Sequence, residues 1–157
     1  MLSKIIIFSL CFYSFSQSIP ENRSSSYIKK YYSRYASNKI KTCQIVAHRA
    51  QRENLDAIEL ITLSFIETRH TNHLTSKKGA KGALQALPRY WSRPTDKDFI
   101  DAGLRAWKYY KLNSSTLQET AGRYNGAGEG SYYARSFLKH YQKLKRLQKT
   151  LKAGARL

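Results

Sequence analysis

One carboxylate stands at the end of a nearly unbroken apolar stretch. Residues 60–68, "LITLSFIET", place Glu67 after a run with little polar surface. If the run is a buried helix, desolvation and the negative end of the helix dipole both raise the pKa of this side chain. A carboxyl group with a raised pKa is suited to general acid catalysis near neutral pH. The alternative is a surface glutamate at a frayed helix end, paired with Arg69.

Two later segments contain residues that can contact a sugar. The segment 76–85, "SKKGAKGALQ", has two glycines, which let the backbone approach a ligand closely. Its last residue, Gln85, has an amide that can bond hydroxyl or amide groups. The segment 123–130, "RYNGAGEG", combines an aromatic residue, an amide and glycines at a predicted helix end. Glycine after a helix is usually a C-cap, so each segment alone is weak evidence for a binding site.

Taken together and in this order, the segments resemble a known family. The chain is similar to the soluble lytic transglycosylases, of the lysozyme-like superfamily that includes goose-type lysozymes. The family's catalytic glutamate lies on a helix of the type "ALIAVES", and the counterpart here is "LSFIET", which ends in Glu67 and Thr68. The family segments "S-x-x-G-A-x-G-L-M-Q" and "A-Y-N-A-G" correspond to Ser76, Gly79, Ala80, Gly82, Leu84 and Gln85 and to residues 123–127. A later family tyrosine falls at Tyr132 or Tyr133, and the resemblance covers residues 45–141.

The resemblance implies a peptidoglycan lytic transglycosylase with one catalytic carboxyl group. Glu67 would protonate the leaving oxygen of the β-1,4 bond between N-acetylmuramic acid (MurNAc) and N-acetylglucosamine (GlcNAc), while the substrate's N-acetyl group supports the developing positive charge. The carboxylate would then take the proton of the MurNAc 6-hydroxyl, which closes a 1,6-anhydro ring without consuming water. By the same resemblance Tyr124 would orient Glu67, and the substrate would be held by Thr68, Ser76, Gln85, Tyr124, Asn125, Tyr132 and Tyr133.

Two other functions stay open. A hydrolytic muramidase of goose-type character on the same fold would need a second carboxylate to activate water, with Asp101 or Glu119 as candidates. A non-catalytic cationic protein that binds the cell wall or lipopolysaccharide would need only the groove and the charge. No metal or cofactor is expected, because His70 and His73 lie three residues apart with no third ligand evident.

The N-terminus and the charge predict export and anionic partners. Residues 1–18 combine Lys4, an apolar stretch and small residues, as is typical of a secretory signal peptide, with an uncleaved anchor as the alternative. We expect the protein in the periplasm or outside the cell. The formal net charge of +18 favours polyanions. The expected partners are peptidoglycan glycan strands and an anionic wall or membrane surface contacted by the basic termini, with no specific nucleic acid.

The elements that must position these residues are predicted to be helices. No alternating run of β-branched residues occurs, so we expect an all-α fold: a lysozyme-like single catalytic domain with a buried central helix. That helix is predicted at 55–68, capped by Asn54, after a short helix at 45–52. The expected parts are a signal peptide (1–18), a basic Tyr-rich arm (19–44), the transglycosylase domain (45–141) and a basic C-terminal helix or tail (142–157).

Overall fold

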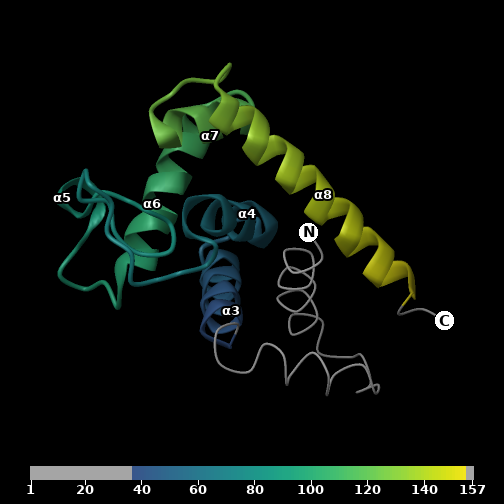
Figure 1. Ribbon diagram of the computed structural model, residues 1–157, viewed down its shortest axis with the longest axis horizontal. Coiled ribbons are helices and arrows are strands. Elements are labelled where there is room, and N and C mark those ends of the chain that lie inside the picture. Colours follow the sequence, from purple (N-terminus) through teal and green to yellow (C-terminus); the bar gives the residue numbers. More distant parts are fainter. Residues whose placement is uncertain (1–36, 155–157) are drawn as a thin grey trace.

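The computed structural model describes residues 37–154, and this part of the chain is helical (Figure 1). The helices are α3 (Ser37–Arg52), α4 (Ala57–Thr68), α5 (Pro88–Trp91), α6 (Phe99–Leu112), α7 (Leu117–Asn125) and α8 (Tyr132–Gly154). No strand occurs among residues 37–154, which confirms the all-α prediction for them. The predicted signal peptide and most of the Tyr-rich arm lie outside the described residues. None of the helices described is long and apolar enough to cross a membrane.

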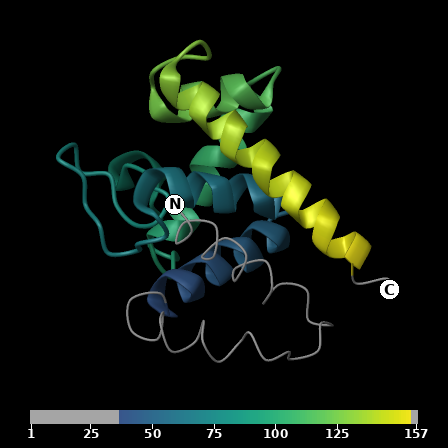
Figure 2. The ribbon, with the colours of Figure 1, turned by 45° about the vertical axis from the view of Figure 1, so that its right-hand side comes forward.

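Helix α4 is buried over most of its surface because other helices cover it. Both α3 and α8 pack against α4, and α8 runs across it and extends beyond it (Figures 1 and 2). One part of α4 enters an apolar cluster around Trp107, and another enters a second cluster that contains Cys43 and Leu144. Its nearly continuous apolar sequence therefore reflects packing on more than one side.

The start of α4 differs from the prediction. The N-cap is Asp56 and not Asn54, because the Asp56 carboxylate accepts a hydrogen bond of 2.8 Å from the backbone N–H of Ile58. The same carboxylate pairs with Lys145 of α8 at 2.7 Å and accepts a bond of 3.3 Å from the Tyr141 hydroxyl. A charged cap is stabilised by the positive end of α4 and by Lys145, which favours aspartate in this position.

Two predicted domain boundaries fall inside helices. Helix α3 begins at Ser37 and not at 45, so residues 37–44, which were assigned to the arm, are part of the packed helices. Cys43 in this segment is 0% exposed. Helix α8 likewise runs through the boundary between 141 and 142, and Leu144 beyond it is 3% exposed. Because Cys43 and Leu144 share one apolar cluster, both segments belong to the same body.

A buried polar contact ties α4 to α6. Glu59, in the first turn of α4, accepts a hydrogen bond of 3.0 Å from Trp107 Nε1. Its other oxygen, Oε1, lies 2.7 Å from the Lys111 ammonium. A buried carboxylate requires partners of this kind, and these two come from the helix that also lines the groove described below.

Candidate active site

Glu67 lies in the last turn of α4, and the C-cap residue Arg69 that follows this helix has a left-handed conformation (φ 54°). The hydroxyl of Tyr133, from the first turn of α8, donates a hydrogen bond to Glu67 Oε1. Burial raises the pKa of Glu67 above its ordinary value, and the bond from Tyr133 works in the opposite direction. The Arg69 guanidinium does not pair with Glu67 but donates to the Phe65 carbonyl at 2.9 Å. The arrangement is therefore a partly buried acid beside a phenol, not a surface ion pair.

A groove of about 430 Å³ opens beside Glu67, within the size range of small-molecule sites. Its walls come from helices α4 to α7 and from the loop between α4 and α5. Five predicted site residues meet on this surface: Glu67, Ser76, Gln85, Tyr124 and Asn125. The remaining lining residues are Lys78, Ala80, Ala86, Leu87, Tyr90, Trp91, Ala106 and Tyr110.

The loop between α4 and α5 forms one wall of the groove and is held by its own polar groups. Ser76 Oγ accepts a bond of 3.0 Å from the Ala80 N–H, and Gln85 Nε2 donates to the Gly82 carbonyl at 2.9 Å. Gly82 has a φ of +75°, and a Cβ built there would lie 2.7 Å from Phe99 Cβ. A larger residue would therefore push the loop away from α6. Ser76 and Gln85 line the groove and also fix the shape of this wall.

Tyr124 lines the groove without a hydrogen bond to Glu67. Its hydroxyl donates to the Leu84 carbonyl at 2.6 Å. Burial, and then the nearby charge of Glu67, hold the pKa of Tyr124 well above its ordinary value. This geometry corrects the expectation that Tyr124 orients Glu67, because the direct contact comes from Tyr133. Tyr132 and Tyr133, both expected to hold substrate, are absent from the groove lining. Tyr132 is 81% exposed, whereas Tyr133 contacts Glu67 through its hydroxyl.

Thr68 faces the protein interior. Its side chain lies 3.0 Å from the Ala83 carbonyl through Oγ1, and the same oxygen accepts a bond of 3.1 Å from the Thr71 N–H. The residue is 6% exposed and is absent from the groove surface. This corrects the expectation that Thr68 holds substrate: it connects the end of α4 to the loop that carries Ser76 and Gln85.

No family model, curated protein or solved structure matches this chain. The chemistry that the groove can support therefore follows from its own residues. Glu67 is the one carboxylate among the residues that line it. The two other acids considered from the sequence have cationic partners elsewhere: Asp101 pairs with Arg49 at 3.0 Å, and Glu119 pairs with Arg123 at 2.7 Å. The groove thus offers one carboxyl group and no second carboxylate.

An aromatic wall of the groove was not predicted. Trp91, at the end of α5, and Tyr110, on α6, line the groove with their ring centroids 5.8 Å apart. Arg105 fixes this wall by donating to the Trp91 carbonyl from Nε at 2.9 Å and from Nη2 at 2.6 Å. The signal in the sequence was the segment "PRYW", in which Pro88 occupies the first helical position and starts α5. The groove is also lined by one cation, Lys78.

The two histidines near α4 do not form a site together. His70 is buried with Nδ1 at 3.0 Å from Ser64 Oγ. Burial, and then the charges of Lys39 and Arg69, lower the pKa of His70 to about 3, so its ring stays neutral at physiological pH. His73 is exposed in the loop. Within residues 37–154 no group of three or more His, Cys, Asp or Glu side chains could hold a metal ion.

Proposed function

We propose that the protein is a peptidoglycan lytic transglycosylase, with a lysozyme-like fold around α4 and Glu67 as its single catalytic carboxyl group. One observation carries the proposal: a partly buried carboxyl group with a raised pKa borders a groove that contains no second carboxylate. The ordered resemblance of the Glu67, Gln85 and Tyr124 segments to the soluble lytic transglycosylases supports the same activity. The substrate is the glycan strand of peptidoglycan, cut between MurNAc and GlcNAc, outside the cytoplasm.

In the first step Glu67 acts as the general acid. Burial penalises the carboxylate form, so Glu67 keeps its proton to a higher pH than an exposed glutamate does. The proton moves to the O4 oxygen of GlcNAc as the bond between this oxygen and MurNAc C1 breaks. The N-acetyl group of MurNAc supports the positive charge at C1, a task that a second protein carboxylate performs in most glycosidases.

In the second step the same side chain acts as the base. Ionised Glu67 takes the proton of the MurNAc 6-hydroxyl while O6 forms a bond to C1. The product is 1,6-anhydro-MurNAc, and Glu67 returns to its protonated form without water being consumed. The Tyr133 hydroxyl donates to Glu67 Oε1 and stabilises the carboxylate that exists between the two steps.

The other groove residues suit a muramic acid glycan. Gln85 and Asn125 supply amides for hydroxyl and N-acetyl groups, and Trp91 and Tyr110 supply ring faces for the apolar sides of sugars. Lys78 supplies one positive charge at the groove. This charge favours the lactyl or peptide carboxylates that muramic acid carries and that a neutral GlcNAc polymer lacks.

Mass spectrometry of digested peptidoglycan tests the reaction. We expect wild-type protein to release fragments that end in 1,6-anhydro-MurNAc, because the groove has no second acid to activate water. Fragments that end in reducing MurNAc would instead identify the hydrolytic muramidase.

A matched pair of variants tests the role of Glu67. We expect Glu67→Gln to slow fragment release by roughly 10²–10⁴-fold while binding to insoluble peptidoglycan persists, because the substitution keeps the shape and removes the proton. Glu129→Gln makes the same chemical change outside the groove, where Glu129 Oε1 accepts a bond of 2.8 Å from Thr116, and should keep wild-type activity. Full activity in Glu67→Gln would refute the proposed catalytic role, and the absence of any lytic activity in wild type would favour the non-catalytic wall binder.

A further inference from the structure

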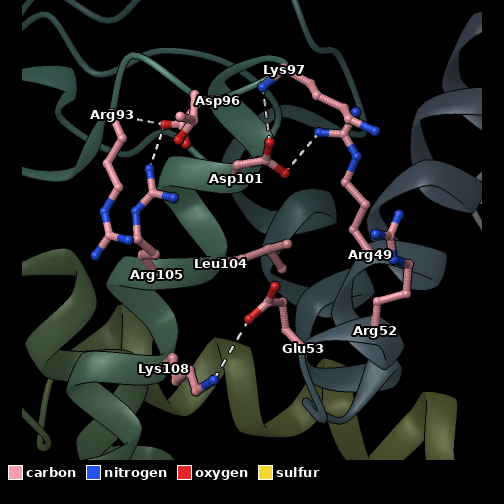
Figure 3. A pocket seen from close by; sticks show the side chains of 11 residues that line it. Arg49, Arg52, Glu53, Arg93, Asp96, Lys97, Asp101, Leu104, Arg105 and Lys108 are labelled. Carbon is pink, nitrogen blue, oxygen red and sulfur yellow. Dashed lines mark hydrogen bonds and ion pairs between the residues drawn. The ribbon is translucent and has the colours of Figure 1, made fainter.

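A second pocket, of about 300 Å³, lies between α3, α6 and the loop that leads into α6 (Figure 3). It shares no lining residue with the groove beside Glu67. Two of its arginines, Arg49 and Arg52, come from α3, whereas Arg93 and Lys97 come from the loop and Arg105 comes from α6. The close view shows these side chains arranged around the pocket, with Asp101 and Leu104 between them.

The pocket carries an excess of positive charge. Six of its lining residues are arginine or lysine and three are aspartate or glutamate, which gives a net charge of +3. Asp98 stands outside the lining but pairs with Arg49 at 2.7 Å, and including it still leaves +2. Like charges gathered in a concave surface raise the local concentration of anions.

Three of the six cations have carboxylate partners within the pocket. The pairs are Arg49 with Asp101 at 3.0 Å, Arg105 with Asp96, and Lys108 with Glu53 at 3.6 Å. These contacts, which Figure 3 draws as dashed lines, use all three lining carboxylates. None of the three lining carboxylates is within ion-pair distance of the side chains of the other three cations.

Those other cations are Arg52, Arg93 and Lys97, and none of them forms an ion pair with any residue between 37 and 154. The loop that carries two of them is held by its backbone. The Arg93 N–H donates to Asp96 at 2.8 Å, and the Lys97 N–H donates to Asp101 at 3.0 Å. The acids therefore shape the loop and leave three positive side chains at the pocket for a ligand.

The donor set favours phosphate oxygens. Guanidinium and ammonium groups bind phosphate through charge-assisted hydrogen bonds, and an excess charge of +2 to +3 is matched by an anion with more than one negative charge. No aromatic residue lines the pocket, so it lacks the stacking platform that single-stranded nucleic acid uses. We propose that this pocket binds a phosphate-bearing anion that has more than one negative charge and no base, supplied by a soluble polyphosphate or by a lipid headgroup. The proposal is independent of the chemistry at Glu67.

Calorimetric titration of the full chain with inorganic tripolyphosphate tests the site at an ionic strength of about 0.15 M, where long-range attraction is largely screened. The pocket variant combines Arg52→Gln, Arg93→Gln and Lys97→Gln. The control variant combines Lys77→Gln, Arg135→Gln and Lys139→Gln, which removes the same charge from exposed positions outside the pocket, the groove and the two basic termini. We expect the pocket variant to bind at least roughly tenfold more weakly, since each exposed ion pair contributes up to about fivefold, and the control to change by less than about twofold.

Vesicle-binding experiments identify the source of the phosphate. Vesicles of phosphatidylcholine with and without phosphatidic acid test the headgroup: binding that requires phosphatidic acid and is lost in the pocket variant supports a lipid source. Loss confined to tripolyphosphate supports a soluble source. The proposal fails if wild type shows no saturable binding to either probe, if both triple variants weaken binding equally, or if a thymidine oligonucleotide binds the pocket more tightly than tripolyphosphate. Unchanged thermal unfolding of both variants shows that the comparison concerns folded protein.

Discussion

The two ends of α4 each carry a glutamate, and their surroundings differ. Glu59, in the first turn, accepts a bond from Trp107 and pairs with Lys111. Glu67, in the last turn, has the Tyr133 hydroxyl as its partner, and burial raises its pKa. The first turn of a helix also favours negative charge, whereas the last turn disfavours it. One residue type on one helix thus forms an ion pair at the first end, and at the second end it is the proton donor of the function that we propose.

Replacing each of the two glutamates by glutamine should give the largest difference between the two ends of α4. We expect Glu67→Gln to lower the rate of glycan cleavage by roughly 10²–10⁴-fold, because the general acid is lost. Glu59→Gln should instead lower the free energy of unfolding by about 1–3 kcal/mol, because Lys111 loses its charged partner. Cleavage assays and chemical denaturation measure the two effects. If Glu59→Gln removed activity at unchanged stability, the two ends would not differ in the way that we describe.

The tyrosine pair at the start of α8 provides the next comparison. Tyr133→Phe removes the bond that lowers the pKa of Glu67, so that pKa should rise further and the alkaline limb of the cleavage profile should move to higher pH. We also expect roughly tenfold slower cleavage near neutral pH, because the intermediate carboxylate loses a hydrogen bond. Tyr132→Phe alters an exposed neighbour, so it should change neither the rate of cleavage nor the pH of the alkaline limb of the profile. An unchanged pH profile in Tyr133→Phe would show that the phenol does not act on Glu67.

Two adjacent lysines allow a smaller test of the groove itself. Lys78 lines the groove and its neighbour Lys77 does not. We expect Lys78→Gln to raise KM for peptidoglycan by about two- to fivefold with little change in kcat, which corresponds to one exposed ion pair with a substrate carboxylate. Lys77→Gln removes the same charge and serves as the control. Equal changes in both variants would indicate general attraction between a basic protein and the wall.

The smallest expected effect concerns stability and pH. A carboxyl group whose pKa rises on folding binds its proton more tightly in the folded state. Its contribution to stability is therefore complete below the unfolded pKa, 4.5, and is lost as pH rises through the folded pKa. Because the amide does not titrate, Glu67→Gln should gain stability relative to wild type as pH rises above 4.5. Thermal unfolding across this range measures the gain, and a constant difference would contradict the raised pKa.

Local patterns predicted much of the helical structure and the position of the acid. The apolar run of 60–66 predicted the buried helix, and Glu67 does lie in its last turn. The cap was harder, because Asn54 and Asp56 are both good caps in isolation. Asp56 also pairs with Lys145, which lies 89 positions further along the chain, and no local pattern indicates that contact. The start of α3 was missed because its first residues are polar and exposed or half-buried, and the buried Cys43 that follows is covered by residues of α4 and α8.

The sequence predicted which residues line the groove better than it predicted the hydrogen bonds that their side chains form. The order of the motifs and the family resemblance predicted one site that contains Ser76, Gln85, Tyr124 and Asn125. All four residues line the groove. The direction of a hydroxyl depends on the nearest acceptor after packing, and no local pattern specifies that acceptor. The Tyr124 hydroxyl thus bonds the Leu84 carbonyl. The aromatic wall at Trp91 depends on how α5 meets α6, which is a long-range contact.

Helix α8 contacts both ends of α4, so the spacing of residues along one helix must match the spacing along the other. It contacts the N-cap Asp56 through Lys145 and the terminal Glu67 through Tyr133. At 1.5 Å per residue, Tyr133 and Lys145 are about 18 Å apart along α8. Asp56 and Glu67 are about 17 Å apart along α4. Deleting or inserting one residue between 133 and 145 would rotate Lys145 relative to Tyr133 by about 100° and shift it by about 1.5 Å. The contacts with Asp56 and Glu67 could then not both be kept. The position of the phenol beside the acid therefore depends on the ion pair between Lys145 and Asp56 at the opposite end of α4.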